Sequence, residues 1–272
     1  MLISATSALV LNWTSREIWE SRNARSYFEG LDLSEGNSLL KLYNEQEHYM
    51  HTQAVTNRKY FVRKYILEFL SACQKENKKG QVIILAAGIA PLSVEIASIF
   101  PQSMVFDVDK YSMIEKEKYL DNICPNIKCI ECDITDIDLL KRKLIQNGWD
   151  TENPCILVLE GIVYYLLEKD LRNILAFFAN NNAILVADFV LEPEYINEKN
   201  RIFGVEAFRK IKEAVGLDFV NFYDPLYFMK LIGESGFKNA KRITMDDIQF
   251  ERTGKKDPFD CEEPGWVSMV RN

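Results

Sequence analysis

The chain has 272 residues, 47% of them hydrophobic, and a formal net charge of −7, as expected of a globular protein with a substantial core. The acidic balance argues against non-specific nucleic-acid binding, which needs a basic surface. No apolar run approaches the ~20 residues of a membrane span, and the N-terminus lacks the early positive charge of a secretory signal. We therefore expect no membrane partner and treat the N-terminus as mature sequence.

Residues 1–75 contain no convincing strand and predict an N-terminal helical cap. Ser15 is a suitable N-cap for a helix that continues through Tyr27, and another helical stretch begins near Leu39. Residues 57–73 predict a largely apolar helix with a basic first half. Its cations, either a solvated face or part of a site, are Arg58, Lys59, Arg63 and Lys64.

Residues 81–109 begin the core domain, which we place at 76–272. The β-branched run 82–85 is typical of a strand buried on both faces of a parallel sheet. A turn of small residues then allows close approach of the backbone to a ligand, and it consists of Ala86, Ala87 and Gly88. Pro91 suits the first position of the next helix.

A second strand, 104–106, delivers Asp107 and Asp109 at its end. Strand, small-residue turn, helix, strand and acid together are typical of a nucleotide-binding half-site, in which the acid accepts hydrogen bonds from ribose hydroxyls. Because only Gly88 of the usual three glycines is present, an ordinary βαβ unit stays an alternative.

Strands and helices continue to alternate along the rest of the chain. A third strand delivers Asp133 and a fourth ends at Glu160. The predicted strands are 126–132, 154–159, 183–189, 238–245 and 265–270, and the predicted helices are 112–120, 138–147, 169–178, 205–215 and 227–235. The last two strands are expected to be joined by a polar connection without a helix. This pattern predicts an α/β fold with a mainly parallel, doubly wound sheet and an antiparallel edge strand.

The six cysteines are expected to be reduced core thiols, which predicts a cytoplasmic protein. The spacing of Cys124, Cys129 and Cys132 also occurs in iron–sulfur sites, and Asp133 begins a pattern similar to a calcium loop. A calcium loop needs a glycine at its sharp turn and a later glutamate in register, and both are absent here. We expect no metal site.

Three motifs resemble those of the leucine carboxyl methyltransferase family and its bacterial O-methyltransferase relatives. V-I-I-L-A-A-G is similar to the family's V-V-I-L-G-A-G, V-F-D-V-D to V-F-E-V-D, and L-E-G-I-V-Y-Y-L to A-E-G-L-L-M-Y-L. The resemblance covers residues 57–178, and more weakly the chain to residue 236. It implies a Rossmann-like class I methyltransferase fold, S-adenosylmethionine as cofactor, S-adenosylhomocysteine as product and methyl transfer to an oxygen.

The resemblance also implies roles for individual residues. The turn would line the amino-acid end of the cofactor, and Arg58 or Lys59 would hold its carboxylate. Glu160 would lie near its amino group. From the nucleotide-binding pattern and the resemblance together, the residues expected to bind the cofactor are Arg58, Lys59, Ala86, Ala87, Gly88, Asp107, Asp109, Asp133, Ile134 and Glu160.

The acceptor is expected to be a small-molecule or peptide carboxylate, or a hydroxyl. A carboxylate is already ionised at neutral pH and needs no general base, whereas a hydroxyl usually does. The candidates for a catalytic role are Tyr165 and Tyr164, which follow Glu160, and His51 as a base. We expect the substrate pocket to be built from the N-terminal helices and from an insertion around 192–222, which contains Tyr195, Arg201, Phe203, Phe208 and Arg209.

Departures from the family pattern keep two alternatives open. Ala90, Pro91 and Leu92 stand where family members usually have Asp-Thr-Arg. A degenerate, methyltransferase-like binding protein is therefore an alternative. A nicotinamide-dependent oxidoreductase shares the spacing of Asp107, but the missing glycines and the Glu160 motif argue against it.

Overall fold

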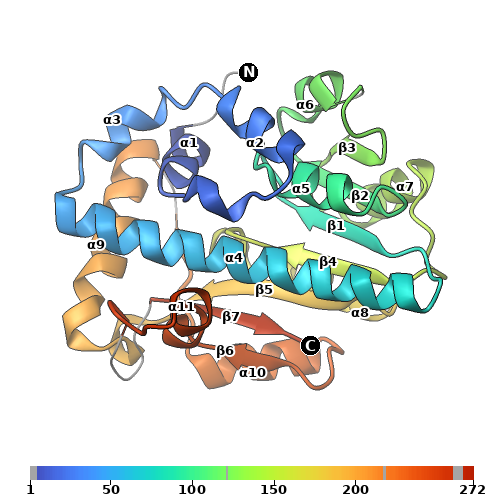
Figure 1. Ribbon diagram of the computed structural model, residues 1–272. Coiled ribbons are helices and arrows are strands. Elements are labelled where there is room, and N and C mark those ends of the chain that lie inside the picture. Colours follow the sequence, from blue (N-terminus) through green and yellow to red (C-terminus); the bar gives the residue numbers. More distant parts are fainter. Residues whose placement is uncertain (1–4, 121, 217–218, 260–265) are drawn as a thin grey trace.

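The structure is a computed structural model that describes residues 5–120, 122–216, 219–259 and 266–272. Within these residues seven strands form one sheet in the order β3-β2-β1-β4-β5-β7-β6 (Figure 1). The strands are β1 (Gln81–Leu85), β2 (Met104–Asp109), β3 (Ile127–Glu131), β4 (Cys155–Leu159), β5 (Ile184–Val190), β6 (Lys241–Ile243) and β7 (Val267–Arg271).

The first five strands run parallel, and β7 is antiparallel to both of its neighbours, β5 and β6. The predicted fold class is confirmed, with the reversed strand lying next to the edge. The chain order changes direction between β1 and β4. In doubly wound sheets, ligands bind in the crevice at the carboxyl ends of the strands at such a point.

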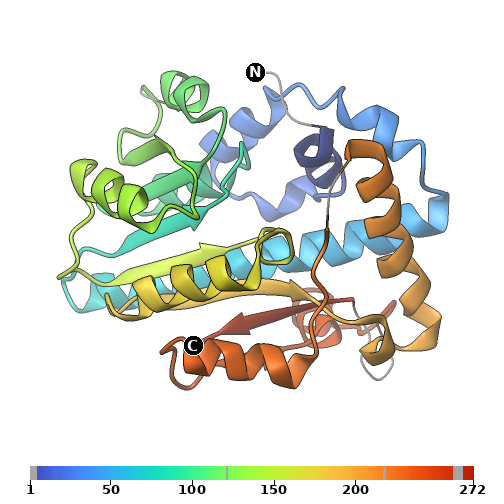
Figure 2. The same cartoon turned by 180° about the vertical axis from the view of Figure 1, so that it is seen from behind.

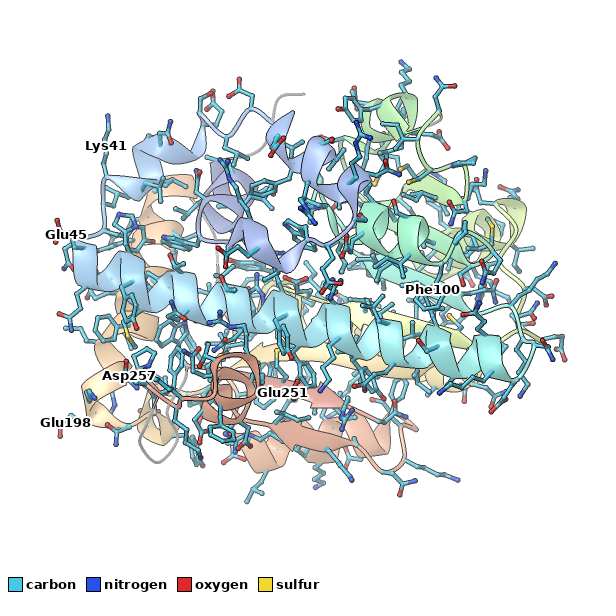
Figure 3. All side chains as sticks on the ribbon, viewed as in Figure 1. Lys41, Glu45, Phe100, Glu198, Glu251 and Asp257 are labelled. Atoms are coloured by element: carbon cyan, nitrogen blue, oxygen red, sulfur yellow. The ribbon has the colours of Figure 1, made fainter. Side chains whose placement is uncertain are left out.

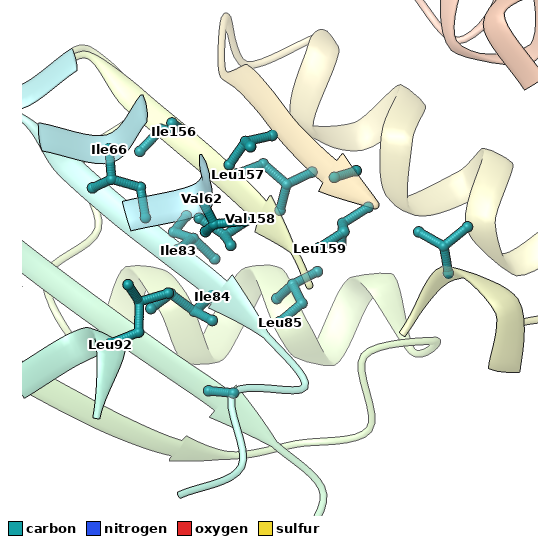
Figure 4. Close-up of a cluster of buried hydrophobic side chains, with 14 of the residues drawn as sticks. Val62, Ile66, Ile83, Ile84, Leu85, Leu92, Ile156, Leu157, Val158 and Leu159 are labelled. Atoms are coloured by element: carbon teal, nitrogen blue, oxygen red, sulfur yellow. The ribbon is translucent and has the colours of Figure 1, made fainter. Parts of the chain in front are cut away.

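Helices cover both faces of the sheet (Figures 1 and 2). One face is covered by α4 (Glu45–Lys75), α5 (Leu92–Ile99) and α11 (Met245–Thr253). The other is covered by α7 (Ile137–Gln146), α8 (Glu168–Ala179) and α10 (Pro225–Glu234). Because both faces are covered, β1 and β4 are buried at every position. Figure 4 shows Val62 and Ile66 of α4 beside Ile83 and Val158 in this core.

The described residues 5–75 form helices and turns, but the helix predicted from Ser15 through Tyr27 is wrong. Its place is taken by a 3-10 turn, η1 (Arg16–Ile18), and a separate helix, α2 (Arg22–Glu29). The backbone N–H groups of Glu20 and Ser21 donate to the buried Glu95 carboxylate, both at 2.9 Å. These bonds draw the chain out of a helical path, and Ser21 then caps α2.

The helix predicted at 57–73 is the second half of a much longer one. It begins at Glu45, where Asn44 and Glu47 form a reciprocal capping box. Figure 3 shows Glu45 at the start of α4 and Glu251 of α11 beside the middle of this helix. Lys64 binds Glu251 at 2.5 Å, which ties the C-terminal helix to α4.

Three smaller sequence predictions were also wrong. Pro91 is the N-cap of α5 rather than its first helical residue. The last two strands are joined through α11, which Gly254 ends in a left-handed conformation, and β6 has only three residues. The remaining helices are α1 (Ala5–Asn12), α3 (Gly36–Leu40), α6 (Met113–Leu120), α9 (Glu198–Val215) and the short 3-10 turns η2 (Val163–Tyr165) and η3 (Pro193–Tyr195).

Within the described residues, none of the helices combines the length and the apolar character needed to cross a bilayer. The five described cysteines are free and buried, as expected for core thiols; Cys261 lies outside the described residues.

Candidate functional site

A cavity of about 370 Å³ lies at the carboxyl ends of β1, β2 and β4. This volume falls within the range of small-molecule and cofactor sites. Its wall comes from α1, α4, the turns after β1 and β4, and the end of β2. The lining residues with a predicted role are Arg58, Lys59, Ala86, Ala87, Gly88, Asp107, Asp109, Glu160, Tyr164 and Tyr165.

The turn after β1 has an unusual backbone. Both Ala86 and Gly88 have positive φ angles, 54° and 51°, in the left-handed region. A Cβ built on Gly88 would meet only Ser7 Oγ, at 3.8 Å, so its backbone conformation rather than space favours glycine. The Gly88 N–H donates to Asp109 Oδ2 at 2.8 Å, which fastens the turn to the end of β2.

Two bases of α4 face two acids, Glu160, which follows β4, and Asp188, which lies within β5. Glu160 Oε1 accepts from Lys59 Nζ at 2.8 Å and from Arg58 Nε at 3.1 Å. Arg58 Nη1 lies 3.4 Å from Asp188 Oδ2, and Asp188 also accepts from the Gly161 N–H at 2.6 Å. All four charged side chains are at most 8% exposed, so this Arg58 cluster (Arg58, Lys59, Glu160 and Asp188) is a charge-balanced buried network.

Burial and charge act in opposite directions on the pKa values of the Arg58 cluster. Burial raises the pKa of the Glu160 carboxyl, but Lys59 and Arg58 outweigh it and hold the pKa below its usual value. Burial lowers the pKa of Lys59 despite the nearby Glu160. For Asp188 burial prevails over Arg58, so the pKa is raised. The ionisation of each group in the Arg58 cluster therefore depends on the charged partners beside it.

The two tyrosines differ in their hydrogen bonds. The Tyr164 hydroxyl accepts from Arg58 Nη1 at 3.4 Å. Within the described part of the chain the Tyr165 hydroxyl has no hydrogen-bond partner, although its ring lines the cavity. Burial raises the pKa of Tyr165 to about 12, so at neutral pH its O–H is a donor.

Three residues with a predicted role do not line the cavity. Asp133 and Ile134 follow β3, and the Asp133 carboxylate binds Lys110 at 3.2 Å on the surface. His51 is buried in an aromatic cluster, with its ring centroid 4.6 Å from that of Trp13 and 5.3 Å from that of Trp266. Burial lowers the pKa of His51 to about 3, so the ring is neutral at physiological pH.

Because His51 is buried without its proton, we expect it to make stability depend on pH. The unfolded chain takes up this proton below about pH 6.5, whereas the folded chain does so only near pH 3. The unfolded state thus binds more protons between these values, and stability falls as the pH falls. His51→Phe is expected to remove about 2 kcal/mol of the loss in unfolding free energy between pH 7 and pH 5.

Urea unfolding of both proteins at the two pH values measures this difference. His48→Gln, one helical turn away, is the control and should keep the wild-type pH dependence. Equal slopes for wild type and His51→Phe would show that the charges around His51, Glu47 and Lys210 among them, compensate for its burial.

The insertion expected to help build the pocket lies close to the cavity without lining it in its described residues, 192–216 and 219–222. One of its rings, that of Phe208, has its centroid 5.2 Å from that of Tyr164. Arg209 is on the surface, paired with Glu206 and Glu213 of its own helix.

Sequence reasoning overlooked several residues at the site. Asp188 carried a signal, since it is a lone acid in the apolar strand A-I-L-V-A-D-F. Lys116 carried none, because it lies in a helix rich in charge, yet it is fully buried. The wall supplied by α1 was also not predicted in detail, and it consists of Thr6, Ser7, Val10 and Leu11.

The architecture is similar to that of other solved structures. Over 99% of this chain and 98% of the other, the structure is similar to a DUF574 family protein from Streptomyces avermitilis, with a TM-score of 0.65 and 13% identity. A second similar structure is a putative methyltransferase from Thermobifida fusca, with a TM-score of 0.65 and 13% identity over 97% of this chain and 93% of that one. No curated protein sequence matches the chain.

The sheet order, the helical layers and these structural similarities define a Rossmann-like methyltransferase fold of class I. The sequence profile of the leucine carboxyl methyltransferase family matches residues 16–179, which is more than half of the chain. The chain belongs to the leucine carboxyl methyltransferase family, and the resemblance stated from its motifs is confirmed.

Proposed function

We propose that this protein is an S-adenosylmethionine-dependent O-methyltransferase that acts on a small-molecule or peptide carboxylate, with a hydroxyl acceptor as the alternative. The observation that carries the proposal is a single cavity that presents both an arginine with a free donor and an acid with a free lone pair. Membership of the family supports it independently.

The donor is Arg58. Its Nε and Nη1 are used within the Arg58 cluster, but Nη2 makes no hydrogen bond to any described residue. A guanidinium with one open edge is suited to a carboxylate such as that of the cofactor's methionine end. Glu160 and Asp188 would hold the guanidinium in place, and Lys59 adds a second positive charge.

The acid is Asp109. Its carboxylate accepts from the N–H groups of Gly88, Lys110 and Tyr111, and a carboxylate offers about four acceptor positions. The remaining capacity suits a ribose hydroxyl. The left-handed turn beside it brings backbone rather than side chain toward the cavity. Asp133 and Ile134, which follow the neighbouring strand, are proposed to contact the adenine at the outer rim.

When bound, the cofactor supplies an electrophilic methyl group on a sulfonium. The protein's task is then to align an acceptor oxygen and exclude water, and alignment accounts for much of the rate in such displacements. The free Tyr165 hydroxyl is proposed to donate to the acceptor. None of the described residues that line the cavity is a histidine. This favours a carboxylate acceptor, because a carboxylate needs no general base. We do not propose His51 as a general base, because it does not line the cavity.

Calorimetric titration with S-adenosylmethionine and S-adenosylhomocysteine tests the cofactor. We expect micromolar binding of both, no heat with reduced nicotinamide dinucleotide, and binding weakened about 10- to 100-fold in Asp109→Ala. Asp138→Ala, an exposed acid on α7, is the matched control and should bind as the wild type does.

The absence of binding by the wild-type protein at millimolar cofactor would overturn the proposal. A screen of carboxylic acids and phenols with methyl-labelled cofactor then tests the acceptor. Cofactor binding without methyl transfer to any acceptor would point to the binding-protein alternative.

A further inference from the structure

The buried side chain of Lys116 lies directly beneath the turn that lines the cavity. Lys116 comes from α6, and its ammonium nitrogen lies 2.7 Å from Asp107 Oδ2, with neither side chain exposed to solvent. A lysine is rarely buried completely, because removing its charge from water is costly unless it is paired. The cost of burying this charge indicates that Lys116 has a role beyond ordinary core packing.

The same ammonium also binds the turn itself. It donates to the carbonyl oxygens of Gly88 at 3.0 Å and of Ala90 at 3.4 Å. The ammonium of Lys116 thus makes two hydrogen bonds to the turn after β1 and an ion pair with Asp107 of β2. These contacts meet the turn at Gly88, where the backbone is in a left-handed conformation.

The turn is therefore held from two sides. Asp109 binds the Gly88 N–H, and Lys116 binds the Gly88 carbonyl. This arrangement also explains why an acid is buried at position 107. Asp107 is among the residues that line the cavity, but both of its carboxylate oxygens are buried and Oδ2 lies against the Lys116 ammonium.

We propose that Lys116, anchored by Asp107, is a positioning residue that holds the turn of residues 86–90 in the conformation that receives the amino-acid end of the cofactor. This inference rests on the proposed function. In this role Asp107 acts through Lys116 and not as the ribose-binding acid. A purely structural pair would stabilise the fold without setting the shape of the turn.

The two roles are separated by comparing Lys116→Met with the double variant Lys116→Met/Asp107→Val. The single variant leaves a buried carboxylate unpaired, so it is expected to be unstable. The double variant removes both charges, and replacing a buried ion pair by apolar groups of similar volume is often neutral for stability. We therefore expect the double variant to fold, with the carbonyl oxygens of Gly88 and Ala90 left without their donor.

We measure the dissociation constant of S-adenosylhomocysteine and the hydrogen exchange of the backbone amides in residues 86–90 without ligand. In the double variant we expect about tenfold weaker binding, of the order of one charge-assisted hydrogen bond, and exchange of the turn faster by a similar factor. Lys118→Met, an exposed lysine on the same helix, should change neither quantity.

Wild-type affinity and wild-type exchange in the double variant would overturn the positioning role while leaving the proposed function intact. If neither the wild type nor the variants bind the ligand, the proposed function is wrong. Hydrogen exchange of the ligand-free double variant still tests Lys116 in that case, because unchanged exchange would reject its role in shaping the turn. If Lys116→Met does not fold, the double variant alone decides.

Discussion

Glu160→Gln is expected to lower the free energy of unfolding by about 3–5 kcal/mol, the usual cost of removing one partner from a buried ion pair. Glu160 is the only carboxylate of the Arg58 cluster that binds both bases directly, at 2.8 Å to Lys59 and 3.1 Å to Arg58. Without its charge, two buried cations face each other, with Asp188 as their remaining partner. Urea unfolding of the variant and the wild type at pH 7 measures the difference.

Two further variants make this prediction specific. Glu168→Gln removes an acid from a partly exposed pair with Arg172 and should cost no more than about 1 kcal/mol. The double variant Glu160→Gln/Lys59→Met removes one charge of each sign and should recover part of the lost stability. A cost for Glu160→Gln no larger than that for Glu168→Gln would show that the cluster is not energetically coupled.

Gly36→Ala is expected to displace α1 and so to weaken both the fold and ligand binding. A Cβ at Gly36 would lie 2.8 Å from the backbone of Ala8 and Leu9, and neither backbone can rotate away as a side chain could. Overpacking of this kind typically costs about 1–3 kcal/mol. Because Ser7, Val10 and Leu11 of α1 line the cavity, we expect S-adenosylhomocysteine to bind at least about tenfold more weakly.

Gly233→Ala is the matched control for this substitution. Gly233 lies within helix α10, and a Cβ there would meet nothing within 4 Å. Alanine in an open helical position is expected to raise stability by about 0.5–1 kcal/mol, with ligand affinity unchanged. If Gly36→Ala changes stability alone, then α1 does not shape the binding cavity.

Local patterns in the sequence predicted most of the sheet. The apolar run from Val82 to Leu85 is buried at every position, because a strand covered by helices on both faces needs apolar side chains at every position. The same patterns failed near Ser15, where the helix is interrupted. The cause is Glu95, 75 residues away from Glu20, and a local pattern does not contain such a contact.

The sequence alone determined the fold class and the family, since both follow from the alternation of predicted strands and helices and from short motifs that are local in the chain. It could not distinguish Asp107 from Asp109, which lie two residues apart and on the same face of β2. The tertiary structure shows that the two acids have different surroundings. Both residues line the cavity, but Asp107 pairs with Ile84 inside the sheet and its carboxylate is buried against Lys116, whereas Asp109 lies beyond the end of β1. Depth within the sheet and long-range ion pairs set the chemistry of an acid, and both depend on the assembled fold.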